Sequence, residues 1–295
     1  MRSVSIIGIG RVGGALAIAL DRAGFAVDQL IYRGDSNLRA VRNHLPNSVK
    51  YTNNSELTGF SSDISIIASG DPEIEKVASA ISKLTSLPKV VLHVSGVLSS
   101  DALLSARNAG CSVGSIHPLV AISDPILGAD RFRNSYFCVE GDEEAVEAAG
   151  SIVESLGGIP FTIATQDKPL YHASAVMAAG HMVALVDSAI KMLAACGIEE
   201  EKAQQILFPL IQSNVSNLST QVPSDALTGP YARGDIETFE RHLHAFDGKV
   251  GADIRRIYLD LALREVGMML EREPASGKHL KLAELISVAK EKSEC

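Results

Sequence analysis

The sequence predicts an α/β protein in which an N-terminal doubly wound parallel sheet is followed by an all-helical C-terminal domain. Short apolar runs alternate with helical patterns as far as residue 164. From Lys168 onward the strand pattern disappears and long helical patterns replace it. A chain of 295 residues is long enough for two domains with separate cores. We therefore expect a nucleotide-binding domain at residues 1–164 and a helical domain for substrate binding and dimerisation at residues 165–295.

Seven apolar segments are the expected strands of the sheet. In chain order they are SVSIIGI, AVDQLIY, DISIIAS, KVVLHVS, CSVGSI, SYFCVEG and IPFTIA. Helices are expected between them at residues 11–23, 72–84, 99–108 and 143–156. Such alternation is typical of parallel strands that are joined by crossover helices.

The C-terminal domain is expected to consist of long helices. Helical patterns cover residues 169–196, 198–218 and 248–270, and a charged amphipathic helix begins at Lys278. A polar break, TGPYARGD, interrupts the pattern before helix resumes near Ile236. In this break Thr228 and Arg233 are candidate substrate contacts, since an arginine can bind a carboxylate through two hydrogen bonds. An ordinary loop with an Arg–Asp pair is the alternative.

Composition and charge exclude several classes of protein. The net charge of -8 argues against a nucleic-acid partner, which would require clustered lysine and arginine. No uninterrupted apolar stretch approaches the ~20 residues of a membrane span. The four cysteines lie far apart without metal-binding spacing, so we expect no metal site and reduced thiols in a cytoplasm.

The segment SVSIIGIGRVGGALAIAL places Gly8-x-Gly10-x-x-Gly13 between an apolar strand and an apolar helix. One glycine makes the tight turn, one lets the backbone approach a pyrophosphate, and one allows the helix to pack closely on the strand. Free amide groups at the start of the helix then bind the phosphates. The motif predicts a Rossmann dinucleotide site that includes Arg11 and Val12.

The segment LIYRGDSNLR, at the end of the second expected strand, indicates which dinucleotide binds. A carboxylate is typical there when the cofactor is NAD, because it binds the ribose hydroxyls. Here the sequence has Tyr32 and Arg33, with Ser36 close behind. Arginine can pair with the 2′-phosphate of NADP, so NADP(H) is the expected cofactor. Asp35 keeps NAD open, since a register shift of one or two residues would bring it to the ribose.

Other candidates follow the later strands, because ligands bind at the carboxyl ends of the strands in this type of sheet. Ser69 and Gly70 are expected beside the adenosine or its ribose. Ser95 and His117 are expected near the nicotinamide ring. Ser95 could instead serve as a turn or cap residue, because a helix start follows it. His93 lies inside its strand and is expected to be a core residue.

The segment TQDKPLYHASAVMAAGHMV begins the first long helix of the C-terminal domain. Residues four apart share a helix face, so Lys168 and His172 should point the same way. The helix dipole disfavours positive charge at this end and should lower the pKa of Lys168, which suits proton transfer to a substrate oxygen. The alternative is a solvated lysine and a histidine bonded to a backbone carbonyl.

IIGIGRVGGALA followed by a helical domain resembles the 6-phosphogluconate-dehydrogenase-like superfamily, which includes ketopantoate and pyrroline-5-carboxylate reductases. GSIHPL, DKPLYHASAVMAAGH and ALTGPYARGDIETFERHL resemble a narrower family of Rossmann-like proteins with a C-terminal domain of unknown function. The resemblance implies an NADP-dependent oxidoreductase that forms a homodimer, with 2-ketopantoate among its possible substrates. In the superfamily a lysine, followed four residues later by an asparagine, serves the reacting oxygen. Lys168 matches the lysine, but His172 replaces the asparagine.

Ketopantoate reductases also carry a glutamate in the helical domain, and Glu237, Glu240 and Glu265 cannot be told apart as its counterpart. The sequence thus predicts an NADPH-dependent reductase of a small carbonyl compound, most simply a 2-oxo acid, or of an imine, bound between the domains. Lys168 or His172 would donate the proton. The alternative is a non-catalytic NADP-binding redox sensor or assembly protein that acts through its helical domain. Turnover of bound NADPH distinguishes the two.

Overall fold

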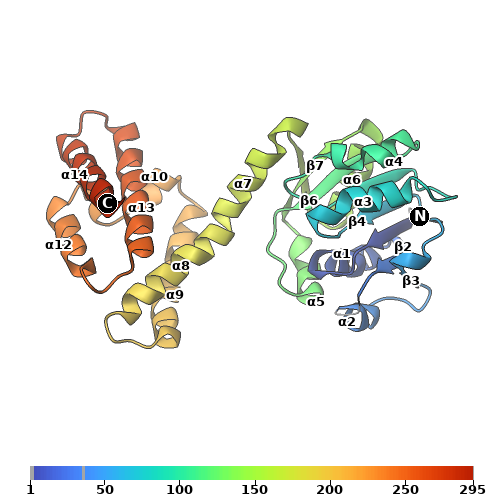
Figure 1. The fold of residues 1–295 in the computed structure, drawn as a ribbon, viewed down its shortest axis with the longest axis horizontal. Helices are drawn as coiled ribbons and strands as arrows, with labels where there is room; N and C mark the ends of the chain where they lie inside the picture. Colours follow the sequence, from blue (N-terminus) through green and yellow to red (C-terminus); the bar gives the residue numbers. More distant parts are fainter. Residues whose placement is uncertain (1–2, 35–36, 295) are drawn as a thin grey trace. The chain divides into compact units, whose positions relative to one another are not determined.

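The chain folds into two compact units, Met1–Ala179 and Gly180–Cys295, in a computed structural model that describes residues 3–34 and 37–294 (Figure 1). The division falls after helix α7 (Lys168–Ala178), later than the boundary expected at residue 164. Lys168, the first residue of α7, is hydrogen-bonded to residues of the N-terminal sheet. Helix α7 therefore belongs structurally to the N-terminal unit.

An eight-stranded sheet, counted over the described residues, forms the centre of the N-terminal unit in the order β3-β2-β1-β4-β5-β6-β7-β8. The strands are β1 (Ser3–Ile7), β2 (Ala26–Tyr32), β3 (Lys50–Asn53), β4 (Ile64–Ile67), β5 (Val90–His93), β6 (Ser112–Pro118), β7 (Tyr136–Gly141) and β8 (Ile159–Thr162). The order from β3 to β6 is that of a Rossmann fold, with the strand order reversing at β1. The α/β fold class predicted from the sequence is confirmed.

The expectation of a wholly parallel sheet was wrong at one pairing, because β7 runs antiparallel to β6. A parallel return needs a crossover that carries the chain back to the same end of the sheet. Between β6 and β7 the chain forms only the short helices α5 (Pro125–Gly128) and η3 (Ala129–Phe132) in the part that the structure describes. The amide of Leu119 donates to the carbonyl of Tyr136, so β7 starts beside the end of β6.

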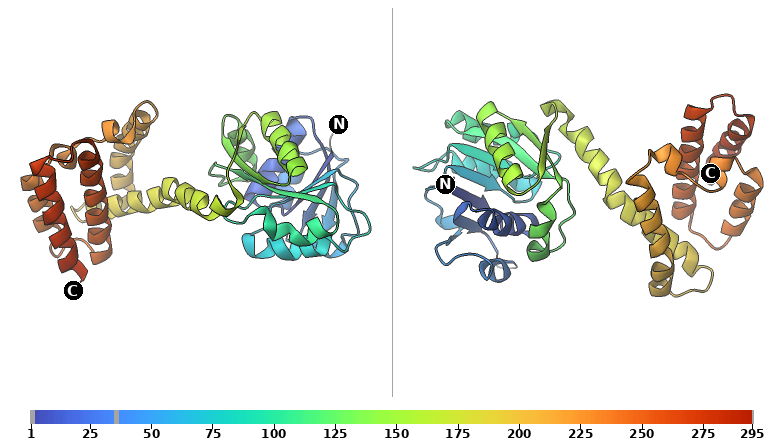
Figure 2. Two further views of the ribbon diagram at one scale, coloured as in Figure 1. Left: turned by 90° about the horizontal axis from the view of Figure 1, so that it is seen from above. Right: turned by 180° about the vertical axis from the view of Figure 1, so that it is seen from behind.

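Two core clusters cover the two faces of the sheet. Successive residues of a strand point to opposite faces, and Ile6 and Ile7 of β1 accordingly belong to different clusters. Helices α1 (Arg11–Arg22) and α6 (Glu143–Ser155) contribute to one cluster. Helices α3 (Asp71–Ile81) and α4 (Leu104–Asn108) contribute to the other (Figure 2). The remaining short helices of this unit are α2 (Leu38–Arg42), η1 (Asn54–Glu56), η2 (Ser100–Leu103) and η4 (Thr165–Asp167).

The C-terminal unit is helical throughout its described part, as predicted. Its helices are α8 (Gly180–Ala194), α9 (Glu200–Leu218), α10 (Pro223–Ala226), α11 (Pro230–Arg233), α12 (Ile236–Phe246), α13 (Ala252–Arg272) and α14 (Gly277–Glu294). The expected amphipathic tail is α14, which buries Leu282 and Ile286 in a cluster with Leu259 and Val266 of α13. These apolar contacts give the unit a core of its own.

The long helix expected at residues 169–196 is divided at Ala179 into α7 and α8. Among the described residues, the stretch Thr165–Ala194 is long and apolar enough to cross a membrane by length and composition alone. Its beginning, however, is polar: Lys168 and Tyr171 make hydrogen bonds to the sheet of the N-terminal unit. Those contacts would be lost if the start of the stretch entered a bilayer, so they favour a role in the folded protein.

Candidate functional site

The turn between β1 and α1 has the backbone geometry of a dinucleotide-binding loop. Gly8 has a φ of 100°, and an added Cβ there would lie 2.8 Å from the carbonyl carbon of Ala68. A Cβ at Gly13 would overlap the carbonyl oxygen of Gly8. At Gly10, by contrast, a Cβ would meet no described heavy atom within 4 Å. Gly8 and Gly13 therefore serve the turn and its packing, while Gly10 leaves room for a ligand.

A cavity of about 390 Å³ opens at the carboxyl ends of β1, β2 and β4. It lies where the strand order reverses, which is the usual place for a dinucleotide in this fold. Its lining includes most of the cofactor residues expected from the sequence, namely Gly8, Gly10, Tyr32, Arg33, Ser69 and Gly70. Arg11, Val12 and Gly13 begin α1 beside the cavity and do not line it. Ser36 and Asp35 lie outside the described residues.

The polar groups of this cavity fit a dinucleotide. The hydroxyl of Ser69 is buried and has no hydrogen-bond partner in residues 3–34 and 37–294. Gly10 caps α1 without a side-chain hydrogen bond from the described part of the chain, so the first amides of the helix are available to phosphate. The Arg33 side chain is 78% exposed at the rim, and its guanidinium lies 3.0 Å from the Glu73 carboxylate. A second ion pair joins Glu73 to Lys76 at 3.0 Å.

Lys168 forms the centre of a second cluster, at the carboxyl ends of β5 and β6. Its side chain is fully buried, and its Nζ donates to the carbonyl of Ser95 at 3.1 Å and to the hydroxyl of Ser115 at 2.9 Å. Burial lowers the pKa of Lys168, while electrostatic interactions with Cys138, Glu140 and Asp71 act against that shift. The lowered pKa expected from the helix dipole thus has burial as its main cause.

His117 and His172 come together beside Lys168. Their ring centroids are 5.8 Å apart and both rings are half-buried. Gly96 makes this approach possible, because a Cβ there would lie 2.7 Å from His117 Nε2 and would also overlap the ring of His172. Lys168 and His172, which are four residues apart on α7, thus both lie near His117.

A hydrogen bond of 2.6 Å joins His117 Nδ1 to the hydroxyl of Tyr171. Burial, followed by the charges of Lys168, His172 and His93, lowers the pKa of His117 to about 4. Burial also raises the pKa of Tyr171, so its hydroxyl keeps its proton. The bond holds the His117 ring through Nδ1, so Nε2 is the ring nitrogen on the side of Gly96.

Ser95 serves Lys168 through its backbone rather than its side chain. Its hydroxyl accepts from the amides of Val97 at 3.3 Å and Leu98 at 3.1 Å, which is the turn-forming role considered as the alternative. His93 is buried, as expected: Nδ1 accepts from the amide of Ser95 and Nε2 bonds the carbonyl of Ser99.

Sequence reasoning missed four residues of this cluster: Gly96, Ser115, Glu140 and Tyr171. Glu140 is only 3% exposed, and its Oε1 accepts from the Ser115 hydroxyl at 2.8 Å. A glutamate within the apolar run SYFCVEG was the available signal, because a carboxylate in a buried strand needs hydrogen-bond partners. Its partner Ser115 could not be identified from sequence, since the two residues meet through the antiparallel register of β6 and β7.

The candidate substrate residues of the C-terminal unit do not share a cavity. Thr228 lines a cavity of about 350 Å³ that also contains Glu265, whose pKa is raised to about 6 by burial. Arg233 is not part of that lining; it is exposed and lies 3.9 Å from Asp235, which caps α12. The Arg–Asp loop considered as the alternative is therefore the arrangement observed at Arg233.

Two family models match the chain. Residues 1–118 match a Rossmann-like domain, and residues 135–265 match DUF2520, a domain of unknown function. The chain is a Rossmann-like protein with a DUF2520 domain. The DUF2520 match begins just before β7, so it includes the last two strands of the sheet together with Glu140 and Lys168. No curated protein matches the chain in sequence.

Solved structures share the fold of this Rossmann-like DUF2520 protein. One is a Bacteroides fragilis protein proposed to be an NADP oxidoreductase, with 19% identity, a TM-score of 0.72, and 90% of this chain and 97% of that chain covered. Protein TM1727 from Thermotoga maritima has 22% identity and a TM-score of 0.63, with 99% of this chain and 98% of that chain covered. Pyrroline carboxylate reductase from Plasmodium falciparum, with NADP bound, has 15% identity and a TM-score of 0.55, covering 91% and 98%. At these identities the neighbours show a shared fold.

Proposed function

We propose that this protein is an NADP(H)-dependent oxidoreductase that reduces a small carbonyl compound or an imine. The observation that carries the proposal is the adjacency of two sites at one edge of the sheet. The dinucleotide-type cavity is built on the ends of β1 and β4, and the Lys168 cluster is built on the ends of β5 and β6. Strand β4 pairs directly with β5, so the two sites are neighbours.

NADP(H) is the proposed cofactor because Arg33 stands at the end of β2, where a 2′-phosphate would lie. Gly10 and the first amides of α1 would hold the pyrophosphate, and the unpartnered Ser69 hydroxyl would bond a ribose or phosphate oxygen. Glu73 competes for Arg33 through its ion pair, so a bound 2′-phosphate would have to take Arg33 from it. When bound, the cofactor supplies the hydride.

Three side chains share the remaining chemistry in this proposal. His172 is half-buried in the position of the superfamily asparagine, and it orients the substrate oxygen or nitrogen and donates a proton to it. His117 Nε2 is a second donor beside it. Lys168 lies behind them with its donors directed to Ser95 and Ser115, and it acts as a fixed positive charge that stabilises the developing anion.

Two substrate classes follow from this chemistry, 2-oxo acids such as 2-ketopantoate and cyclic imines. Both carry a reducible double bond whose heteroatom needs a proton donor. The imine class is also favoured by the fold neighbours, which include imine reductases from Myxococcus stipitatus and Pseudomonas. A reducing cytoplasm is the proposed location, and there the buried Cys111 and Cys138 would remain thiols.

The test is NADPH oxidation, followed by its absorbance, against a panel of 2-oxo acids and cyclic imines, with NADH in parallel. We expect turnover with at least one class, a preference for NADPH, and a loss of about 10²-fold or more in kcat for Lys168→Met and His172→Leu. Lys191→Met is the matched control, because Lys191 is an exposed lysine paired with Asp187 on α8.

Full activity of Lys168→Met would refute the role given to Lys168. Tight NADPH binding without turnover of any substrate would refute the oxidoreductase. In that case a partner protein whose binding depends on the redox state of the cofactor would identify the sensor.

A further inference from the structure

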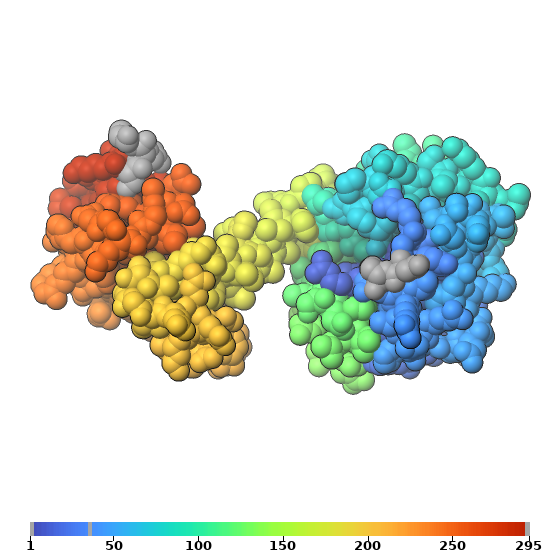
Figure 3. Space-filling view, turned by 60° about the horizontal axis from the view of Figure 1, so that its bottom comes forward, coloured from blue at the N-terminus to red at the C-terminus, as the bar shows by residue number. Residues whose placement is uncertain are grey.

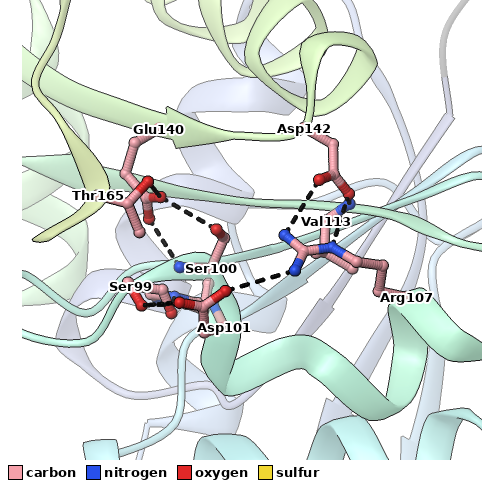
Figure 4. Close-up of polar contacts among 9 residues, drawn as sticks. Ser99, Ser100, Asp101, Arg107, Val113, Glu140, Asp142 and Thr165 are labelled. Carbon is pink, nitrogen blue, oxygen red and sulfur yellow. Dashed lines mark hydrogen bonds and ion pairs between the residues drawn. The ribbon is translucent and has the colours of Figure 1, made fainter.

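Glu140 is a buried carboxylate that acts as the acceptor in each of its hydrogen bonds to the described residues. Counted over the described residues, four donors reach it. They are the amide and hydroxyl of Ser100 and the hydroxyl of Thr165, both residues labelled in Figure 4, and the hydroxyl of Ser115. The distances are 2.8, 3.0, 3.3 and 2.8 Å, two to each carboxylate oxygen. An ionised carboxylate accepts only, so this arrangement suits the charged form.

The Ser115 hydroxyl connects Glu140 to Lys168 in one direction. It accepts a hydrogen bond from Lys168 Nζ at 2.9 Å and donates one to Glu140 Oε1 at 2.8 Å. A hydroxyl has one proton to donate, and Ser115 donates it to Glu140 while it accepts from the Lys168 ammonium group. All three residues are buried, and buried charges require a partner.

Several titratable groups surround Lys168, and Glu140 is the buried carboxylate among them. The groups are Asp71, His93, His117, Cys138, Glu140 and Tyr171, with His172 one turn along α7. Burial lowers the pKa of His93 and of His117 to about 4, so both rings are neutral. Burial raises the pKa of Cys138 and of Tyr171, which keeps both protonated. Asp71 is exposed at the start of α3, where water screens its charge.

We propose that Glu140 is the positioning residue of Lys168: through Ser115 it fixes the ammonium group against the ends of β5 and β6 and keeps it charged. Its importance for catalysis rests on the proposed function, whereas its effect on the charge of Lys168 does not. Without Glu140, burial would favour the neutral amine, and the fixed positive charge behind His117 and His172 would be lost.

The test is a direct titration of Lys168 by NMR of lysine labelled at the side chain, with its signal assigned by its absence in Lys168→Met. We expect Glu140→Gln to move the Lys168 titration to lower pH by about one unit or more, the usual effect of losing a nearby opposite charge. Glu140→Asp should restore most of the shift. Asp142→Asn is the matched control, since Asp142 follows the same strand and pairs with Arg107 instead (Figure 4).

An unchanged Lys168 titration in folded Glu140→Gln overturns the proposal, whether or not a substrate is known. If Glu140→Gln does not fold, Ser115→Ala provides the same test, because it removes the connecting hydroxyl and leaves both charges. We then expect a smaller shift in the same direction, and no shift overturns the proposal. Once a substrate is found, the alkaline limb of the kcat profile should move to lower pH with Glu140→Gln and stay in place with Asp142→Asn.

Discussion

His93 and His117, two histidines beside Lys168, make the stability of the N-terminal unit depend on pH. Burial lowers the pKa of each to about 4, from about 6.5 in an unfolded chain. Between these values the unfolded state binds more protons than the folded state. Stability should therefore be complete above about pH 6.5 and fall as pH decreases toward 4, by about 1.4 kcal/mol for each unit of pKa difference.

The measurement is the urea concentration at the unfolding midpoint, taken across this pH range. His93→Gln and His117→Gln should each flatten part of the slope, whereas replacing a histidine with no buried contacts in the N-terminal unit, such as the exposed His44, should leave it unchanged. A flat profile in the wild-type protein would show that neither ring is held neutral.

The sequence could predict a site residue where a local pattern selects it, but not where its partner lies far away in the chain. Lys168 and His172 are four residues apart on one helix, and His117 follows an apolar strand, so local pattern was enough to select them. Glu140 and Ser115 meet through a strand pairing whose antiparallel direction has no local signature. Ser95 contacts Lys168 through its backbone carbonyl, while its hydroxyl closes a turn. A backbone contact does not depend on residue type, so the sequence could not predict it.

At the level of the β1–α1 element, two glycines should respond differently to the same substitution. Gly13→Ala places a Cβ against the Gly8 carbonyl and should destabilise the N-terminal unit by about 1–3 kcal/mol. Gly10→Ala meets open space and should cost less than about 1 kcal/mol in stability. Gly10→Ala should instead weaken NADPH binding by about tenfold or more, because the added methyl group lies in the cavity where the pyrophosphate would bind. Thermal unfolding and fluorescence titration with NADPH separate the two effects, and equal binding by Gly10→Ala and wild type would contradict the assigned cavity.

The elements themselves were predictable where a single strand or helix carries a strong apolar pattern. The seven apolar runs are strands, and the helices of both halves begin and end near the expected residues. The missed strand β3 has the sequence KYTN and pairs only with β2 at the edge, where little burial is required. The break between α7 and α8 was also missed, since its Ala-Ala-Gly sequence lacks a proline or a polar cap.

At the scale of the whole molecule, helices α8 and α9 leave large apolar side chains on the surface. They pack on each other, yet Val183 of α8 is 67% exposed and Phe208 of α9 is 54% exposed. Further exposed members are Met182, Leu185, Ile206, Leu210, Val215 and Leu218. The two helices belong to the yellow and orange surface in Figure 3. Apolar surface gathered on two neighbouring helices marks an association site more often than a solvent-facing one.

We expect a second copy of the chain to cover this surface, giving the homodimer that the family resemblance implies. Light scattering after size exclusion should give twice the chain mass for the wild-type protein. Val183→Asp combined with Phe208→Asp should produce monomers, because two carboxylates would be buried without partners in the interface. Leu104→Asp is the matched control: Leu104 is 52% exposed on α4 of the N-terminal unit, so the dimer should persist. A monomeric wild-type protein at high concentration would contradict the homodimer. A dimer that survives the double substitution would place its interface away from α8 and α9.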